Sequence, residues 1–499
     1  MRLLFVVPKL DESLVRGEYP HIGIGFLSEV LLNQEIDHEI VDMTLGYGPD
    51  YLKDYIKRYR PDVIALPTYS YRFASTKKMI DFLAGLKEEY GFRILLGGPH
   101  ISCMGKKGMV EGVDFGIKGE GEETLVEFCR TFEEQRKEGK DYSGIKGLIW
   151  RKKLQNRQDH KKENHANDDK AQTDEVVENE DRPWNQDLDS IPYPKYSKFE
   201  FDKYLCSRDR YIRINTSRGC PYQCIFCSVK FVTGSKFRAR SPENLVKEVS
   251  YWRKRGYRKF EFVDDNFTLV KDRVMEFCDL TDKKGLDIDF NLFGGVRVDR
   301  IDRELLERLK QCGLKKVIYG VETVNEQVLK NIKKDITFER IKETFEITRQ
   351  VGVPFGVFFS IGHPGQTYQH VMDDLKFIKE QGIKDVTYCN MVPYPGSELK
   401  SWVDRNARYV VPRDRYLDKV SYMQDEPIYA TDDFTAYERK KALQKAHSFC
   451  DKGLYTMKFG NMLGTAVWLG TRSKKINDSV YRMVNTRIGR ALFNMIKKE

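Results

Sequence analysis

The sequence predicts an α/β protein in three parts: an N-terminal doubly wound parallel sheet over 1–140, a central partial (β/α)6 barrel over 206–400, and a C-terminal α-helical region over 401–499. Three observations lead to this prediction. Short apolar segments alternate with amphipathic ones over 1–130, the alternation returns from residue 211, and the last part of the chain is amphipathic and basic. Strands that are apolar throughout are typical of parallel sheets covered by helices on both faces.

Five strands are expected in the N-terminal sheet, and amphipathic helical segments separate them. They cover residues 2–8, 38–43, 61–69, 93–99 and 114–118. Ligands of such sheets bind at the carboxyl ends of the strands. Those ends carry Pro8, Thr68 to Ser70, Gly97 to His100 and Gly119 to Glu122, so this edge of the sheet is a candidate binding site.

Size and composition are those of a globular protein of two or three domains, with 499 residues of which 40% are hydrophobic and 12% aromatic. The first apolar run ends before Lys9, too early for a secretory signal. No run approaches the roughly 18 apolar residues of a membrane span. We therefore expect a cytoplasmic protein, in which clustered cysteines bind metal more often than they pair.

Residues 141–205 are predicted to link the first two parts. Within them, 151–182 are almost wholly charged or polar and cannot bury enough apolar surface to order themselves. We expect a disordered loop there. The prolines and aromatic residues over 184–199 instead indicate a segment that is pinned against a domain.

Six strands are expected in the barrel, at 211–217, 259–265, 289–295, 315–322, 354–362 and 386–394. Six strand–helix units over about 185 residues favour an open, partial barrel over a full barrel of eight units. Barrel chemistry gathers at the C-terminal ends of the strands. Three clustered cysteines follow the first of these strands.

Cys220, Cys224 and Cys227 form a CxxxCxxC pattern, with no histidine nearby and Cys206 and Cys278 as the nearest other cysteines. A structural zinc site takes four ligands, usually in two CxxC-like pairs. Three thiolates instead suit a four-iron cluster with one iron left open to N and O atoms of a substrate or cofactor. A zinc site and accidental clustering are the weaker alternatives.

At this pattern the sequence resembles the radical S-adenosylmethionine (SAM) superfamily, whose CxxxCxxC loop follows the first barrel strand. The resemblance covers roughly 210–400. It implies a [4Fe-4S] cluster on the three cysteines, whose open iron binds the amino and carboxylate groups of SAM. The reduced cluster of that family cleaves SAM to a 5′-deoxyadenosyl radical.

The resemblance also implies which residues contact SAM. Phe226 matches the family's aromatic residue before the last cysteine, and Asp264 and Asp265 match the acidic segment that contacts the methionyl ammonium. Arg297 suits a carboxylate through charge-assisted hydrogen bonds, and Glu322 is placed to bond a ribose. The glycine-rich backbone edge expected against the adenosine contains Gly362, Pro364 and Gly365.

The N-terminal part resembles the cobalamin-binding domain that precedes radical enzymes of the anaerobic cyclase and methylase branch, over 19–31, 95–102 and 117–128. The DxHxxG motif that would place a histidine below the cobalt is missing, so the resemblance implies cobalamin without that ligand. His100 is the one nearby histidine of note, and we expect it to pack against a loop. The implied cobalamin contacts are Gly23, Thr68, Tyr69, Ser70, Gly97, Gly98, Gly119 and Glu120.

Two activities share these implied cofactors. The leading hypothesis is methylation of an unreactive carbon by methylcobalamin, with a second SAM to remethylate the cobalt. The alternative is a non-methylating cyclase or oxidase of the anaerobic porphyrin cyclase type. Either activity requires a reducing partner such as ferredoxin or flavodoxin.

Other classes of function fit the sequence less well. A methylthiotransferase carries three more cysteines in its N-terminal domain, whereas only Cys103 and Cys129 precede residue 200 here. A non-enzymatic cobalamin-sensing module would have no use for the motifs around the cysteines. A domain that has lost its cobalamin is a further alternative, which no residue excludes.

The C-terminal region holds the basic part of the chain. Lys452 to Glu499 contains ten Lys and Arg against two acidic residues, within a net charge of +10. Basic amphipathic helices can lie on an anionic membrane surface, and a helical cap over the barrel is the plainer alternative. Few aromatic residues could stack on bases, so a small-molecule, lipid or other hydrophobic substrate is favoured over nucleic acid.

Overall fold

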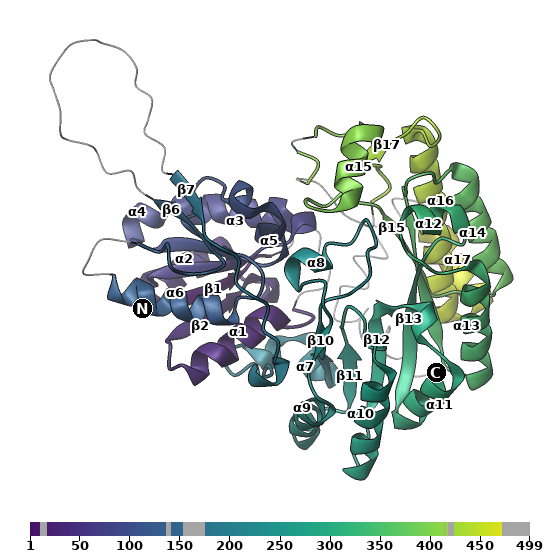
Figure 1. Cartoon of the computed structure of the whole chain (residues 1–499), viewed down its shortest axis with the longest axis horizontal. Helices are drawn as coiled ribbons and strands as arrows, with labels where there is room; N and C mark the ends of the chain where they lie inside the picture. Colours follow the sequence, from purple (N-terminus) through teal and green to yellow (C-terminus); the bar gives the residue numbers. More distant parts are fainter. Residues whose placement is uncertain (10–16, 136–140, 153–174, 414, 418–423, 472–499) are drawn as a thin grey trace, which may run out of the picture.

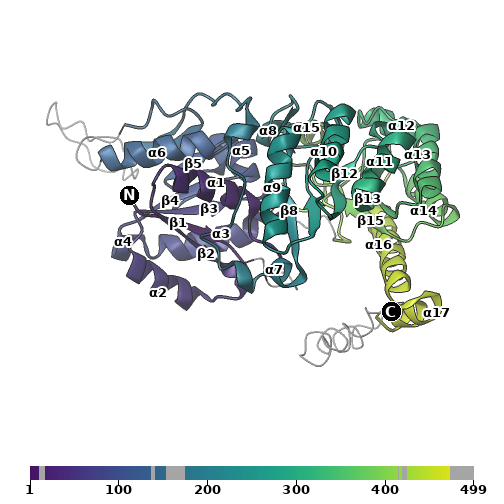
Figure 2. The same cartoon turned by 90° about the horizontal axis from the view of Figure 1, so that it is seen from below.

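The computed structural model describes residues 1–9, 17–135, 141–152, 175–413, 415–417 and 424–471. Two lobes lie side by side in both ribbon views (Figures 1 and 2): an N-terminal lobe in purple and blue, and a larger lobe in green and yellow. Within the described ranges, no helix is both long enough and apolar enough to span a bilayer.

The N-terminal lobe is built on a seven-stranded sheet in the order β2-β1-β3-β4-β5-β6-β7. Its strands are β1 (Leu3–Val7), β2 (His38–Asp42), β3 (Val63–Pro67), β4 (Arg93–Gly97), β5 (Phe115–Ile117), β6 (Leu148–Lys152) and β7 (Glu175–Glu178). The first five are parallel, as predicted. Figure 2 shows α1 (Ile22–Asn33) and α6 (Glu122–Glu134) on one face, and α2 (Pro49–Tyr59) and α3 (Phe73–Ala84) on the other.

The central strand β1 explains why the strands of this lobe are apolar throughout. Leu3 and Phe5 belong to one hydrophobic core, whereas Leu4 and Val6 belong to another on the opposite face of the sheet. Successive side chains of a strand point to opposite faces. Both faces of β1 therefore exclude water, and every position of the strand requires an apolar residue.

Strands β6 and β7 correct the prediction of a disordered loop over 151–182. They pair antiparallel, and β6 also pairs with β5, so the sheet continues beyond residue 140. Arg151 and Lys152 lie in β6, and the predicted loop also includes the whole of β7, while residues 153–174 lie outside the described ranges. A charged sequence can form β7 because an edge strand keeps one side open to solvent.

The second lobe contains the predicted open barrel, a parallel sheet in the order β15-β14-β13-β12-β11-β8. Its strands are β8 (Tyr211–Ile214), β11 (Lys259–Phe262), β12 (Asp289–Val296), β13 (Leu314–Glu322), β14 (Phe355–Ile361) and β15 (Val386–Asn390). The connecting helices include α9 (Pro242–Lys254), α10 (Lys271–Lys283), α11 (Arg303–Cys312), α13 (Phe338–Val351) and α14 (Tyr368–Glu380). The six predicted strand–helix units are confirmed.

The described part of the C-terminal region is mainly helical, as predicted, and also contains one short antiparallel strand pair, β16 (Arg408–Tyr409) and β17 (Tyr429–Ala430). It contains α15 (Glu398–Asn406), α16 (Ala436–Phe459) and α17 (Asn461–Thr471). Helix α16 starts at a capping box between Thr435 and Glu438 and packs against β15 and α14. The rest of the predicted basic helices, over 472–499, lies outside the described ranges.

The segment over 184–199 was predicted to be pinned against a domain, and it contacts both lobes. The backbone N–H of Lys195 donates to Glu29 of α1 at 3.2 Å. The Tyr196 ring lies 6.0 Å from the ring of Trp252 on α9. This segment therefore holds the first lobe against the barrel.

Candidate functional site

The three clustered cysteines lie at the C-terminal end of the barrel strands, between β9 (Ser217–Arg218) and the short helix α8 (Val229–Val232). Their thiols are free and partly exposed. Gly219 makes the entering turn with a φ of +83°, and a Cβ there would lie 2.3 Å from the carbonyl oxygen of Lys236. Only glycine fits this turn.

The three cysteines suit a cluster better than a single ion. Burial raises the pKa of Cys220 and Cys224, and raises that of Cys227 to about 12, so iron would have to displace protons. In the described ranges no three His, Cys, Asp or Glu side chains converge on one metal position. Cysteines that bind different irons of one cluster do not need such convergence.

The two aspartates after β11 have different surroundings. Asp264 holds the loop, because its carboxylate accepts hydrogen bonds from the backbone N–H of Thr216 and of Ser217 and from the Thr216 hydroxyl. Asp265 lies near the cysteines and contributes to the raised pKa of Cys220. Burial and Asp264 raise the pKa of Asp265 itself to about 6. Asp265 is thus the aspartate placed to face a ligand.

Within the part of the chain that the structure describes, Arg297 keeps one guanidinium nitrogen without a protein partner. The other two donate to Asp299 at 2.9 and 3.2 Å and to the carbonyl of Lys334 at 2.8 Å. The guanidinium lies 3.6 Å from the ring centroid of Tyr222 in the cysteine loop. Its Nη1 is buried and unpaired. A buried donor without a partner costs free energy, so this position fits a carboxylate ligand.

Glu322 ends β13 with a left-handed φ of +74°. Its carboxylate accepts from Lys334 at 3.1 Å and from the Ser360 hydroxyl at 2.7 Å. Burial acts to raise the pKa of Glu322, but Lys334, Ser360 and His363 together lower it. An ionised carboxylate has lone pairs left for ribose hydroxyls. Phe226 packs the cysteine loop onto this corner, with its ring 5.6 Å from that of His363.

The glycine-rich corner after β14 is shaped by its protein neighbours. Gly362 has a φ of +116°, and a Cβ there would lie 1.9 Å from Nη2 of Arg439. At Gly365, a Cβ would lie 2.6 Å from the amide nitrogen of Asn331, which also donates to the Pro364 carbonyl at 3.0 Å. These contacts already require both glycines, so an adenosine is not needed to explain them.

A cavity of about 480 Å³ separates the two lobes at this edge. Its first wall includes several residues predicted to contact cobalamin, namely Gly23, Tyr69, Gly97, Gly98, Gly119 and Glu120. Its second wall includes Asn215, Ser217, Arg218, Thr233 and Asp265 of the barrel lobe. A Cβ added at Gly97 would meet nothing within 4 Å. The glycine edge is therefore open to a cofactor at Gly97. By contrast, a Cβ at Gly98 would lie 3.0 Å from the carbonyl oxygen of Thr68, and one at Gly119 would lie 3.2 Å from Trp184.

Thr68 and Ser70 were also predicted to contact cobalamin, but they do not line this cavity. The Thr68 hydroxyl donates to the Gly97 carbonyl at 2.8 Å. Ser70 shares a 3.0 Å hydrogen bond with Nδ1 of His100, whose ring is stacked on Phe73. Burial lowers the pKa of His100 to about 4. All three polar residues serve the packing of the lobe, as expected for His100.

Ion pairs that sequence reasoning did not find join the lobes at the walls of the cavity. Arg218 donates to Glu120 at 3.0 Å and to Glu122 at 2.6 Å. Arg238 donates to both carboxylate oxygens of Glu120 at 2.9 Å. Glu120, predicted to contact cobalamin, therefore already pairs with two arginines of the barrel lobe. Pairs this far apart in the chain leave no local pattern that could reveal them.

His21 is a further cavity residue that the sequence did not single out. Its Nδ1 accepts a hydrogen bond from the backbone N–H of Ile24 at 3.1 Å, as the N-cap of α1. A neutral ring then carries its proton on Nε2 and donates it to the Tyr69 hydroxyl at 2.9 Å. In the sequence, the only feature that could have pointed to His21 was its position directly before a predicted helix, where it acts as the N-cap.

Comparisons with known families agree with this geometry. The Radical SAM superfamily matches residues 214–378, which include the three cysteines, and the B12 binding domain matches residues 13–129, which include the glycine edge. The chain is a radical SAM enzyme with a B12 binding domain.

Known relatives resemble this radical SAM enzyme over most of its length. An uncharacterized methyltransferase of Pyrococcus horikoshii is 27% identical over 90% of this chain and 92% of its own. An anaerobic magnesium-protoporphyrin IX monomethyl ester cyclase of Rubrivivax gelatinosus is 23% identical over 80% of this chain and 69% of its own. The solved structure of the cobalamin-dependent SAM radical enzyme OxsB, at 16% identity, covers 100% of this chain and 75% of its own with a TM-score of 0.70, which shows a shared fold.

Proposed function

We propose that this radical SAM enzyme transfers a methyl group from cobalamin to an unreactive carbon of a small molecule. The observation that carries the proposal is the cavity, which has the glycine edge on one wall and Asp265, beside the cluster cysteines, on the other. When bound, the cluster and SAM supply a 5′-deoxyadenosyl radical that removes hydrogen from carbon, and cobalamin supplies the methyl group. A substrate carbon held in this cavity can be reached from both walls.

The chain's own residues bind and orient the cofactors in this proposal. The unpaired Nη1 of Arg297 donates to the carboxylate of SAM, and Asp265 accepts from its ammonium. The ionised Glu322 accepts from ribose hydroxyls. Each of these roles uses a donor or lone pair that the protein has left available.

The interface ion pairs have a second role in the proposal. Arg218 and Arg238 fasten the wall of the barrel lobe to Glu120 and Glu122 on the wall of the N-terminal lobe. A cavity whose walls are held together admits less water. Water exclusion protects a radical intermediate from side reactions, so these ion pairs support the chemistry without touching the reacting atoms.

Metal content tests the proposal. After anaerobic reconstitution with iron, sulfide and hydroxocobalamin, we expect about four irons and one cobalt per chain. Cys224→Ala should lose iron and SAM cleavage but keep cobalt. Cys103→Ala is the matched control, because this partly exposed cysteine lies outside the cluster loop. Full SAM cleavage by Cys224→Ala would defeat the cluster assignment, and iron without cobalt would defeat methyl transfer from cobalamin.

A non-methylating cyclase is the second candidate, favoured by the relative from Rubrivivax gelatinosus. Both candidates use the same cavity and the same cofactors. SAM with a deuterated methyl group distinguishes them, because only a methyltransferase delivers the label to its product. Electron transfer from ferredoxin or flavodoxin stays a prediction for both.

We also propose peripheral membrane contact through the C-terminal helices, which would suit a lipid or other hydrophobic substrate. Helices α16 and α17 leave large apolar side chains exposed, namely Leu454, Met457, Met462, Leu463 and Leu469. Co-sedimentation with phosphatidylglycerol vesicles should fall when Met462 and Leu463 are both replaced by Glu. Equal sedimentation of the variant and the wild type would remove this proposal.

A further inference from the structure

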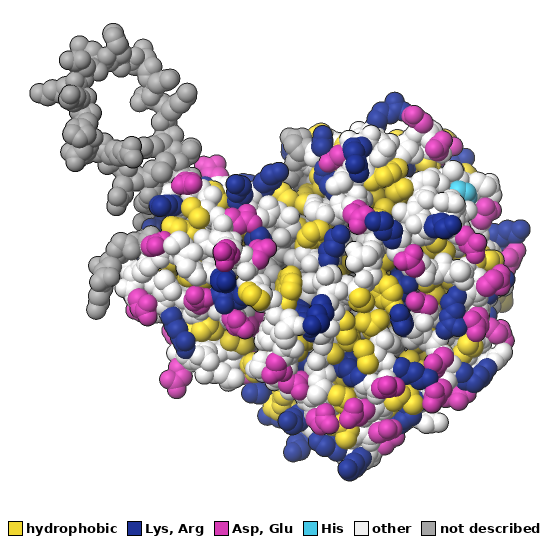
Figure 3. All heavy atoms as spheres, viewed as in Figure 1, with side chains coloured by type: hydrophobic (Ala, Val, Ile, Leu, Met, Phe, Trp, Pro, Cys, Tyr) yellow, Lys and Arg dark blue, Asp and Glu magenta, His cyan; other side chains and the backbone are white. Residues whose placement is uncertain are grey.

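A second space between the lobes has basic walls. It encloses about 950 Å³ between α5 (Pro99–Met104) with η3 (Gly105–Gly108) on one side and the start of α15 on the other. Its cationic lining residues are Lys106, Lys107, Lys118, Lys400 and Arg413. In Figure 3, Lys and Arg side chains stand on both sides of the notch where the lobes meet. We call this space the basic cleft.

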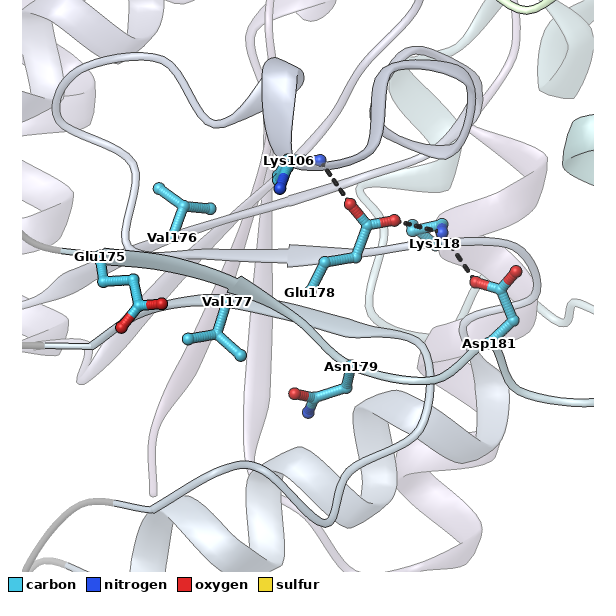
Figure 4. A pocket seen from close by; sticks show the side chains of 8 residues that line it. All are labelled: Lys106, Lys118, Glu175, Val176, Val177, Glu178, Asn179 and Asp181. Atoms are coloured by element: carbon cyan, nitrogen blue, oxygen red, sulfur yellow. Dashed lines mark hydrogen bonds and ion pairs between the residues drawn. The ribbon is translucent and has the colours of Figure 1, made fainter.

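Acidic residues neutralise only part of the first wall. Glu178 is the one acidic residue among the described lining residues. It accepts from the ammonium of Lys118 and from the backbone N–H of Lys106, as Figure 4 shows. Asp181 pairs with Lys118 at 2.7 Å. The Lys118 ammonium thus pairs with two carboxylates. No carboxylate among the described residues pairs with the ammonium of Lys106.

The second wall is closer to balance. Asp404 pairs with Lys400 at 2.6 Å and with Arg413 at 2.9 Å. Among the described residues of this wall, one carboxylate therefore serves two cations, which leaves an excess of positive charge. A cleft lined by one sign of charge raises the local concentration of the opposite ion.

Lys106 and Lys107 provide most of the free charge. Both side chains are exposed, and neither forms an ion pair or a side-chain hydrogen bond with another residue in the described ranges. They come from η3, directly after α5, and line the cleft together. A ligand can therefore bind their ammonium groups without breaking an ion pair or hydrogen bond within the described ranges.

The basic cleft is separated from the cavity by the helix α8. Val232 of α8 lines the cavity, whereas Phe231 of α8 touches Gly396 in the cleft, where an added Cβ would lie 3.3 Å from the ring. Helix α5 also packs against α8. Helix α8 starts at Val229, two residues after Cys227, so the cleft and the cavity lie on different sides of an element that directly follows the cysteine loop.

We propose that the basic cleft binds a phosphoryl group, or a similar multiply charged oxyanion, of a soluble small molecule. Lysine ammonium groups are compact point charges that suit phosphate oxygens. The cleft, at about 950 Å³, has room for such a group. Binding of this anion does not require the radical chemistry of the proposed function.

Calorimetric titration of the full-length protein with inorganic pyrophosphate tests this inference. The wild type should bind saturably, and the double variant K106A/K107A should raise Kd about tenfold or more, because two charge-assisted contacts are lost. R413Q on the second wall should also weaken binding. Both lysines are exposed, so an unchanged melting temperature is expected for the double variant.

The matched control is K283A/K284A. This neighbouring pair is also exposed, at the end of α10, on the side of the barrel opposite the cysteine loop. Its Kd for pyrophosphate should equal that of the wild type. No saturable binding by the wild type, or an equal loss in both double variants, overturns the inference.

Two further measurements separate the alternatives. The first is co-sedimentation with phosphatidylglycerol vesicles. If the protein sediments with them only when Lys106 and Lys107 are present, and does not bind pyrophosphate, the cleft binds a lipid headgroup. That result overturns the inference of a soluble ligand. SAM cleavage is measured on the same reconstituted preparations. A protein that binds pyrophosphate in the cleft but never cleaves SAM retains this inference and refutes the proposed function.

Discussion

Replacing Arg218 by Met should loosen the two lobes. The side chains of Arg218, Glu120 and Glu122 are each only 10–12% exposed. Removing one partner of a buried ion pair costs about 3–5 kcal/mol, because the other charge stays buried without compensation. Arg238 still pairs with Glu120, so Glu122 is the carboxylate that loses its ion-pair partner. We therefore expect the free energy of unfolding to fall by about 3 kcal/mol at pH 8.

The loss should depend on pH. In the wild type, burial acts to raise the pKa of Glu122, but Arg218, a backbone hydrogen bond and Arg238 together lower it, with Arg218 the largest of these. The ionised Glu122 then stabilises the fold above its unfolded pKa of about 4.3, and this contribution fades as pH falls through the lower folded value. Without Arg218, burial raises the folded pKa above the unfolded one. The variant is then least stable at high pH, and its deficit shrinks toward pH 5.

Urea unfolding followed by circular dichroism at pH 8 and pH 5 measures both effects. R258M is the control, because Arg258 pairs with Asp287 at 2.7 Å where both side chains are about half exposed or more. Such a surface pair contributes less than about 1 kcal/mol. An R218M protein as stable as the wild type at pH 8, or a deficit equal at both pH values, would refute this reasoning.

Three further predictions concern single residues. Arg297→Ala should keep its iron and bind SAM about tenfold or more weakly in equilibrium dialysis, because the free Nη1 is lost; loss of iron would contradict this role. Gly362→Ala should lower the free energy of unfolding by at least about 2 kcal/mol, because its Cβ would meet Arg439 at 1.9 Å. Gly382→Ala is its control, since its φ of +65° is also positive but space is open there. Ser70→Ala should leave cobalt content unchanged, because Ser70 bonds a buried histidine outside the cavity; cobalt loss would place Ser70 at the cofactor.

Local sequence was sufficient to predict the barrel and most of the N-terminal sheet. A strand such as β14 is an apolar run between turn residues, because both its faces are covered. The edge strand β7 has no such apolar run, because its Glu175 and Glu178 face solvent or a partner lysine. It was therefore missed. Hydrophobic patterning identified most buried strands but also missed β6, although its Leu148, Ile149 and Trp150 are buried, and it did not identify the strand at the edge.

Motifs predicted where the site lies better than they predicted what each residue does. Asp264 and Asp265 are neighbours in one motif, yet one holds the loop and the other lines the cavity. Gly362 is explained by Arg439, which comes from a helix far along the chain. Arg218 acts through carboxylates about a hundred residues away. Side-chain direction and long-range partners depend on tertiary packing, which a local pattern does not contain.

The contact between Arg439 and the corner at Gly362 has a consequence for biosynthesis. Arg439 is buried in α16, and its guanidinium donates to the carbonyls of Tyr429 and Ile361. A chain emerges from the ribosome with its N-terminus first, and N-terminal domains generally fold before C-terminal ones. The glycine-rich corner is therefore completed only after α16 has emerged, when the cysteine loop has long been translated. A nascent chain that acquires iron early would hold it in an unfinished pocket, so cluster delivery is best timed after synthesis.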